Sequence, residues 1–150
     1  MDSLVQMDTH IKDQNKMEKE KLKTPSEDDV LNKIKKWSSV NFSSEVCGLI
    51  GQENENYVVV LCANKSKNPS SSFVIDPLEY LLFLEKYNVI GLFHSHITGD
   101  ETESEKDIMM SENSCLPFFI YSLNTENFNI YVPKKSKVNV KTLDSFINLA

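Results

Sequence analysis

The sequence predicts an α+β domain in which helices pack on a mixed, largely antiparallel sheet. Three observations lead to this fold class. Apolar residues recur at helical spacing in capped segments, short β-branched runs stand between them, and two pairs of these runs are close enough to form hairpins. The predicted order is helix, strands, helix, strand, helix, strands, which is typical of an α+β architecture.

Composition limits the kind of protein this can be. The chain of 150 residues has the length of one domain, and its net charge of −6 argues against non-specific nucleic-acid binding. No apolar run reaches the roughly 18 residues that a membrane span needs, and the polar N-terminus does not resemble a secretory signal. Three cysteines without a CxxC pair favour buried free thiols. We therefore expect a cytoplasmic protein with no nucleic-acid and no membrane partner.

Residues 1–24 differ from the rest and are predicted to be a polar N-terminal appendage to a domain that spans residues 25–150. The segment is rich in charge, and Leu4, Met7 and Ile11 give only a weak helical stripe. A solvated, partly disordered tail is the simplest interpretation, and a helix that docks on a partner is the alternative.

Two helices have clear start signals. In "SEDDVLNKIKKW", Ser26 is suited to cap a helix, with Asp29 at the reciprocal position of a capping box. In "DPLEYLLFLEKY", Asp76 can cap and Pro77 fits the first helical position. The apolar positions at helical spacing are Val30, Leu31, Ile34 and Trp37 in the first helix, and Leu78, Leu81, Leu82 and Leu84 in a wide face of the second.

The strands are predicted from apolar runs between turn residues. "EVCGLIG" and "NYVVVLCAN" stand at hairpin distance, "FVI" is a short strand after the loop "KSKNPSSS", and "NVIGLFHSH" is a buried strand. "SEKDIMMSENS" predicts a short helix, "LPFFIYSL" and "FNIYV" a second hairpin, and "VNVKTLDSFINLA" a further strand and helix.

The stretch "GLFHSHITGDETESEKD" holds two of the three histidines. Residues two apart on a strand share a face, so His94 and His96 project together as half of a zinc site, with Ser95 on the other side. Taken alone, the His-x-His pair has an alternative interpretation, in which both histidines are simply polar side chains at the rim of a sheet.

A third ligand follows within the same stretch. Ser104 fits a helix N-cap, and Asp107 lies in the first turn, where it can complete a three-ligand site with one open position. An open position is characteristic of catalytic zinc. The acidic loop, with Asp100, Glu101, Glu103 and Glu105, is either a solvated loop or a surface that attracts a basic substrate or modulates the field of the metal. Asp100, Glu101 and Glu103 are also within reach of the metal as a fourth ligand.

The spacing His-Ser-His, seven residues, Ser, two residues, Asp resembles the motif of the JAMM/MPN (JAB domain) metalloproteases, and the resemblance extends over roughly residues 26–133. It implies the cytidine-deaminase-like MPN α-β sandwich fold. It also implies Zn2+ held by His94, His96 and Asp107, with Glu45 of "SSEVCGLIG" as the catalytic carboxylate and Ser104 as a donor to the oxyanion.

The resemblance implies a zinc-dependent metallopeptidase or isopeptidase that cuts a peptide or isopeptide bond in a peptide or protein substrate, which would lie extended beside a sheet edge. "FVIDPLEY" and "SCLPFFIYSLNTENFNIYVP" look most like the phage tail-associated and bacterial branch. A role in phage tail assembly or bacterial protein processing is therefore expected, in the host cytoplasm or on the virion if the gene is a phage's. The alternatives are a non-catalytic assembly module with the same fold, and an amide hydrolase for small molecules or cell-wall peptides.

Overall fold

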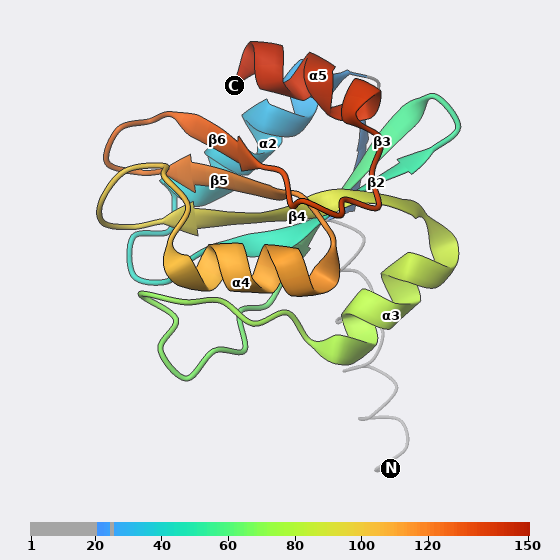
Figure 1. Cartoon of the computed structure of the whole chain (residues 1–150). Helices are drawn as coiled ribbons and strands as arrows, with labels where there is room; N and C mark the ends of the chain where they lie inside the picture. The colour runs from blue at the N-terminus through green and yellow to red at the C-terminus, as the bar shows by residue number, and fades with distance from the viewer. Residues whose placement is uncertain (1–20, 25) are drawn as a thin grey trace, which may run out of the picture.

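A six-stranded mixed sheet forms the centre of the protein (Figure 1). The computed structural model describes residues 21–24 and 26–150. The strand order is β1-β3-β2-β4-β5-β6; β4 and β5 are parallel, and the other neighbours are antiparallel. The predicted α+β class with a largely antiparallel sheet is thus confirmed. The strands are β1 (Lys21–Thr24), β2 (Cys47–Glu53), β3 (Asn56–Cys62), β4 (Asn88–His96), β5 (Phe118–Ser122) and β6 (Phe128–Tyr131).

Helices cover both faces of the sheet. Figure 1 shows α2 and α5 on one face and α3 and α4 on the other. The predicted caps are confirmed, because the side chains of Ser26, Asp76 and Ser104 each accept a hydrogen bond from a backbone N–H of the first turn. The helices are α2 (Glu27–Ser39), α3 (Pro77–Lys86), α4 (Glu105–Ser114) and α5 (Val140–Leu149).

Aromatic rings fill the space between the sheet and the two helices α2 and α5. Trp37 of α2 stacks on Phe93 of β4 with the ring centroids 5.9 Å apart. Gly48 of β2 permits this packing, because a Cβ there would collide with the Phe93 ring and the carbonyl oxygen of Val60. Cys47 packs as a buried free thiol, and burial raises its pKa to about 12, so it is unsuited to act as a nucleophile.

Two predicted strands are absent from the described residues. "FVI", residues 73–75, makes only an isolated bridge between Ile75 and Asn64. The Asn64 side chain holds this segment instead, since its amide donates to Ser72 O and its carbonyl accepts from Val74 N. The C-terminal segment from Val138 onward forms α5 and no strand.

The predicted apolar face of α3 does not enter the core. Phe83 is the buried side chain of this helix, and its ring packs beneath Gly51, where there is no Cβ to obstruct it. Phe83 therefore anchors α3 to the sheet, and the partly buried Tyr80 also packs against the core. The four leucines of the predicted face are all exposed: Leu78, Leu81, Leu82 and Leu84.

Strand β1 was not predicted from the sequence. Its four residues pair with β3 and extend the sheet by one edge strand. The predicted appendage, residues 1–24, includes β1. Residues 1–20 of this appendage, which contain the weak helical stripe, lie outside the described residues. Within the described part of the chain, no helix has the length and apolar character needed to cross a membrane.

Candidate metal centre

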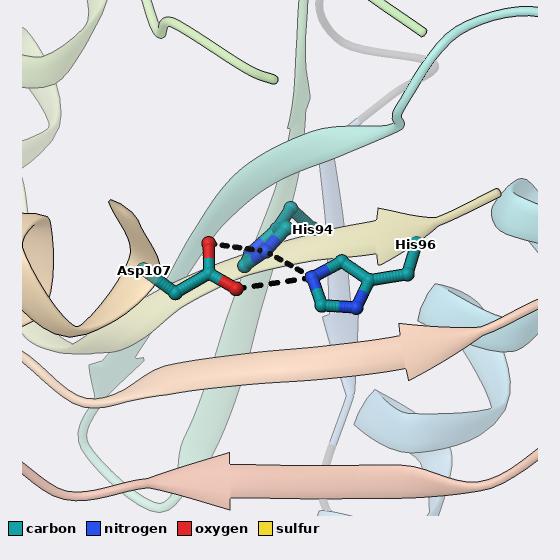
Figure 2. A group of neighbouring side chains, drawn as sticks. All are labelled: His94, His96 and Asp107. Carbon is teal, nitrogen blue, oxygen red and sulfur yellow. Dashed lines mark hydrogen bonds and ion pairs between the residues drawn. The ribbon is translucent and has the colours of Figure 1, made fainter. Parts of the chain in front are cut away.

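Strand β4 places both histidines of the His-x-His pair on the face that α4 covers. Figure 2 shows His94 and His96 on this face. Strand alternation turns Ser95 to the other face, where its backbone and side chain tie β4 to the entry of β2. Ser95 N donates to Val46 O at 2.9 Å, and Ser95 Oγ accepts from Val46 N at 2.8 Å. The residue between the two candidate ligands therefore fixes the segment that carries Glu45.

A capping box brings Asp107 to the histidines. Ser104 Oγ accepts from Asp107 N at 3.1 Å, and Asp107 Oδ2 accepts from Ser104 N at 3.0 Å. The loop before the helix turns at Gly99, whose φ of 79° suits a residue without a side chain. Ser122 of β5 secures that turn by donating to Gly99 O at 2.9 Å. Helix α4 thus begins with its carboxylate aimed at β4.

The three predicted metal ligands converge (Figure 2). Nε2 of His94 lies 3.0 Å from Asp107 Oδ1, Nε2 of His96 lies 3.0 Å from Asp107 Oδ2, and the two Nε2 atoms are 3.3 Å apart. Ligands about 2.0–2.1 Å from a tetrahedral zinc ion lie about 3.3 Å from one another. The donor atoms therefore have the identity and the spacing of a zinc site that lacks one protein ligand.

The surroundings of each ring hold Nε2 toward this centre. His96 Nδ1 donates to the carbonyl oxygen of Asp100 at 2.9 Å, which leaves the Nε2 lone pair for a metal. The fully buried His94 ring stacks on Phe73 at 4.4 Å and meets Phe118 edge-on at 5.7 Å. Its Nδ1 has no hydrogen-bond partner among the described residues, so aromatic packing fixes this ring.

Burial and mutual hydrogen bonds set the charges of these groups. Burial lowers the pKa of His94, with the hydrogen bond to Asp107 opposing it. Burial would also lower the pKa of His96, but its hydrogen bonds with the Asp107 carboxylate and the Asp100 carbonyl raise that pKa overall. For Asp107, burial acts upward, yet hydrogen bonds from both histidines hold the pKa far below its usual range. Asp107 therefore carries a negative charge at any physiological pH.

Glu45 lies on the same side of the sheet as the histidines. In the β2–β4 register Cys47 pairs with His94, so the chain just before β2 lies beside the end of β4 that carries His96. Glu45 lines the same pocket as His96, and the charge of each side chain affects the pKa of the other. The backbone of Glu45 is pinned, because Glu45 N donates to Pro69 O at 2.6 Å and Glu45 O accepts from Asn64 Nδ2 at 3.0 Å. Burial raises the pKa of Glu45 to about 7, against the lowering effect of His96. A carboxylate with this pKa is suited to take up and release a proton near neutral pH.

A pocket of about 290 Å³ joins these groups. Glu45, His96, Ser104 and Asp107 all line it. Ser104 Oγ already accepts a hydrogen bond from Asp107 N, which leaves its own hydrogen free to donate into the pocket. Sequence reasoning did not identify three further lining residues, Phe73, Lys106 and Met110, since no motif marks them.

The acidic loop braces the site, and none of its carboxylates belongs to the cluster that the described residues His94, His96 and Asp107 form. Glu101 Oε1 accepts from Thr125 Oγ1 at 2.6 Å, and Glu103 Oε2 accepts from Asn129 Nδ2 at 2.7 Å, so both carboxylates hold the loop against the β5–β6 hairpin. Asp100 contributes its carbonyl oxygen to His96 rather than its carboxylate to the metal cluster.

Residues 27–132 match the family described as prokaryotic homologs of the JAB domain. The chain belongs to this family. The recognised motif, the fold and the clustered His-His-Asp set are all in accord with that membership.

Relatives of different kinds share this JAB chain's sequence or fold. It is 40% identical over 72 residues to a desampylase of Pyrococcus furiosus, covering 44% of this chain and 51% of the relative. It is 26% identical over 85 residues to tail tip assembly protein K of Escherichia phage N15, covering 57% of this chain and 35% of the relative. The matches thus span between a third and about half of these relatives' lengths. The solution structure of protein DSY2949 from Desulfitobacterium hafniense has a similar fold, with a TM-score of 0.54 at 18% identity over 75% of this chain and 92% of that one.

Proposed function

We propose that this JAB-family protein is a zinc-dependent metallopeptidase or isopeptidase of the JAMM type. The observation that carries the proposal is the meeting of the His94, His96 and Asp107 donor atoms beside a pocket lined by Glu45 and Ser104. Ligand identity and spacing fit Zn2+, and the two remaining groups fit acid–base chemistry and oxyanion binding. Similarity to the desampylase supports hydrolytic activity.

Each residue has one role in the proposed reaction. When bound, zinc supplies the Lewis acidity that makes water nucleophilic near neutral pH. Glu45 accepts a proton from the attacking water and passes it to the leaving nitrogen, as the C–O bond forms and the C–N bond breaks. Ser104 donates a hydrogen bond to the carbonyl oxygen, where negative charge develops. The substrate is a peptide or protein, whose amide is held between Glu45 and Ser104.

The experiment that tests this proposal separates metal binding from turnover. Purified protein is loaded with zinc, its zinc content is measured by mass spectrometry, and it is incubated with a proteome-derived peptide library in which new N-termini are counted. We expect about one zinc per chain and cleavage. Glu45→Gln, which keeps the shape of the side chain but cannot take up the proton, should bind the same zinc and cleave about 10²–10⁴-fold more slowly. Equal cleavage by Glu45→Gln would show that Glu45 is not the base.

A second candidate function is a non-catalytic assembly module, in a phage tail or another complex. Similarity to tail tip assembly protein K supports it. Retention of every ligand position favours hydrolysis over this alternative, because a purely structural module has no need of an open metal site. Zinc-loaded protein that cleaves neither library peptides nor a lysine-branched isopeptide would favour the assembly role. Either function is placed in the cytoplasm, that of the host if the gene is a phage's.

A further inference from the structure

A second pocket, of about 390 Å³, lies beside the candidate active site. Glu45 lines both pockets, whereas His96, Ser104 and Asp107 line only the first. Glu45 therefore borders both hollows. The second hollow, which we call the Trp37 pocket, lies at the end of the sheet on the face that α2 covers. Its lining comes from the end of α2, the loop to β2 and the end of β3: Trp37, Val40, Asn41, Ser44, Glu45, Val46, Leu61, Cys62, Ala63 and Asn64.

The Trp37 pocket is more apolar than the metal pocket. Trp37, Val40 and Leu61 contribute large apolar side chains to its wall. Val40 is 77% exposed although it lines the pocket. Exposed apolar side chains that line a hollow are typical of a binding surface.

The walls of this pocket are fixed by interactions already described. Trp37 is stacked on Phe93, and Val46 N donates a hydrogen bond to Ser95 Oγ. Ser44 N donates to Asn41 Oδ1 at 3.3 Å, which shapes the loop between α2 and β2. Binding in a preformed hollow avoids part of the entropic cost of ordering a site.

The chemistry of Glu45 says which part of a substrate would reach this pocket. Under the proposed function, on which this inference rests, Glu45 hands its proton to the leaving nitrogen and must lie within hydrogen-bond reach of it. The part of the substrate that carries this nitrogen therefore extends on the Glu45 side, away from Ser104. We propose that the Trp37 pocket is a specificity site for an apolar side chain, aliphatic or aromatic, on the amine side of the bond that is cut.

Trp37 provides the test, because it is the only tryptophan in the chain and its fluorescence reports on the pocket. The probes are product-like tripeptide amides with a free N-terminus, Leu-Ala-Ala, Phe-Ala-Ala and Asp-Ala-Ala, titrated into the full chain without added metal. We expect saturable changes in Trp37 emission with the leucine and phenylalanine peptides, at concentrations at least tenfold lower than any change with the aspartate peptide. This measurement requires no turnover.

Two exposed positions give a matched pair of variants. Val40→Asp places a charge at the pocket mouth and should weaken binding of the leucine peptide at least tenfold. Leu81→Asp places the same charge on α3, at a side chain that is 57% exposed, and should leave binding within twofold. Circular dichroism verifies that each variant is folded.

The outcomes separate this inference from the proposed function. Equal binding of the leucine and aspartate peptides, or equal effects of Val40→Asp and Leu81→Asp, would overturn the pocket assignment even if the enzyme cleaves the library. Selective, Val40-dependent binding without cleavage would uphold the pocket as a peptide site and count against hydrolysis.

Discussion

At the scale of single residues, the site uses the same atoms for two tasks. Without metal, Nε2 of each imidazole donates to a different oxygen of Asp107, so the buried carboxylate and both Nε2 atoms have hydrogen-bond partners. Under the proposed function, His94, His96 and Asp107 would hold zinc through these same Nε2 atoms and this carboxylate. The two nitrogens and the carboxylate already lie close together, so zinc would have to displace the protons that they share.

Zinc affinity should therefore rise with pH. The pKa of His96 is raised in the folded protein, by its hydrogen bonds with Asp107 and Asp100 against the effect of burial. Below this pKa a proton occupies the nitrogen that zinc requires, so affinity should increase about tenfold per pH unit until His96 has lost its proton. Competition with a fluorescent zinc chelator between pH 5.5 and 8 measures this slope.

The stability of the metal-free protein should change in the opposite direction. Because the folded pKa of His96 lies above its unfolded value, its contribution to stability is fully present below the unfolded pKa and is lost as pH rises through the folded pKa. Urea unfolding of the metal-free protein over the same pH range isolates this effect when compared with His96→Gln. An affinity for zinc that does not depend on pH would mean that His96 is not a ligand.

Ser104 should show two separable losses on mutation. Its Oγ caps α4, so Ser104→Ala should cost about 1 kcal/mol of folding stability. Its hydrogen is proposed to bind the oxyanion, so the same variant should lower kcat about 10²–10³-fold. Ser104→Thr keeps the hydroxyl and should retain both properties within a small factor. Stability comes from urea unfolding and kcat from library-derived peptides; a loss of stability without a loss of kcat would reduce Ser104 to a helix cap.

At the scale of elements, the features that depend only on neighbouring residues, such as helix caps, could be predicted from the sequence. Ser26, Asp76 and Ser104 were recognised as caps because a cap needs only a side-chain oxygen and the next turn of backbone. Strand β1 could not be predicted, since the edge of β3 creates it and "KLKT" has no apolar pattern of its own. Glu45 was found only through the family resemblance, because its partner His96 is remote in sequence and meets it through strand pairing.

The wide leucine face of α3 shows why periodicity alone misplaces a helix. The pattern indicates which side chains share a face but not whether the sheet offers a surface to receive it. Replacing Leu81 or Leu82 by Ser should therefore change stability by less than about 0.5 kcal/mol, as at other exposed positions. Phe83→Ala should cost about 3–5 kcal/mol, since it empties the contact beneath Gly51. Thermal unfolding of the three variants checks this contrast, and a large loss in either leucine variant would contradict the described packing of α3.

At the scale of the whole molecule, the topology explains where the site lies. The parallel pair of β4 and β5 requires a crossover, and α4 is its helix. The crossover sets the start of α4, with Ser104 and Asp107, beside the C-terminal end of β4, with His94 and His96. Because β2 runs antiparallel to β4, its entry and Glu45 reach the same end. The antiparallel pairing of β2 with β4, together with the α4 crossover, thus brings the segment before β2, the end of β4 and the start of α4 to one end of the sheet.

A site gathered in this way should link metal binding to global stability. Zinc binds the folded chain, in which the ligands of β4 and α4 meet, far better than the unfolded chain, in which they are apart. At a free zinc concentration about 1,000 times Kd the gain is about 4 kcal/mol. For a chain of this length the gain corresponds to a rise in Tm of roughly 10 °C, which a strong chelator should reverse.

Asp107→Asn provides the matched control for this thermal measurement, because it preserves the size of the side chain and its ability to accept from Ser104 N while removing the ligand charge. The variant should fold without metal and show little or no zinc-dependent rise in Tm. A rise of equal size in Asp107→Asn would place the stabilising zinc elsewhere on the chain. An unchanged Tm in the original protein, at a zinc concentration that saturates the chelator competition, would mean that the metal does not join β4 to α4, and the proposed mechanism would fail with it.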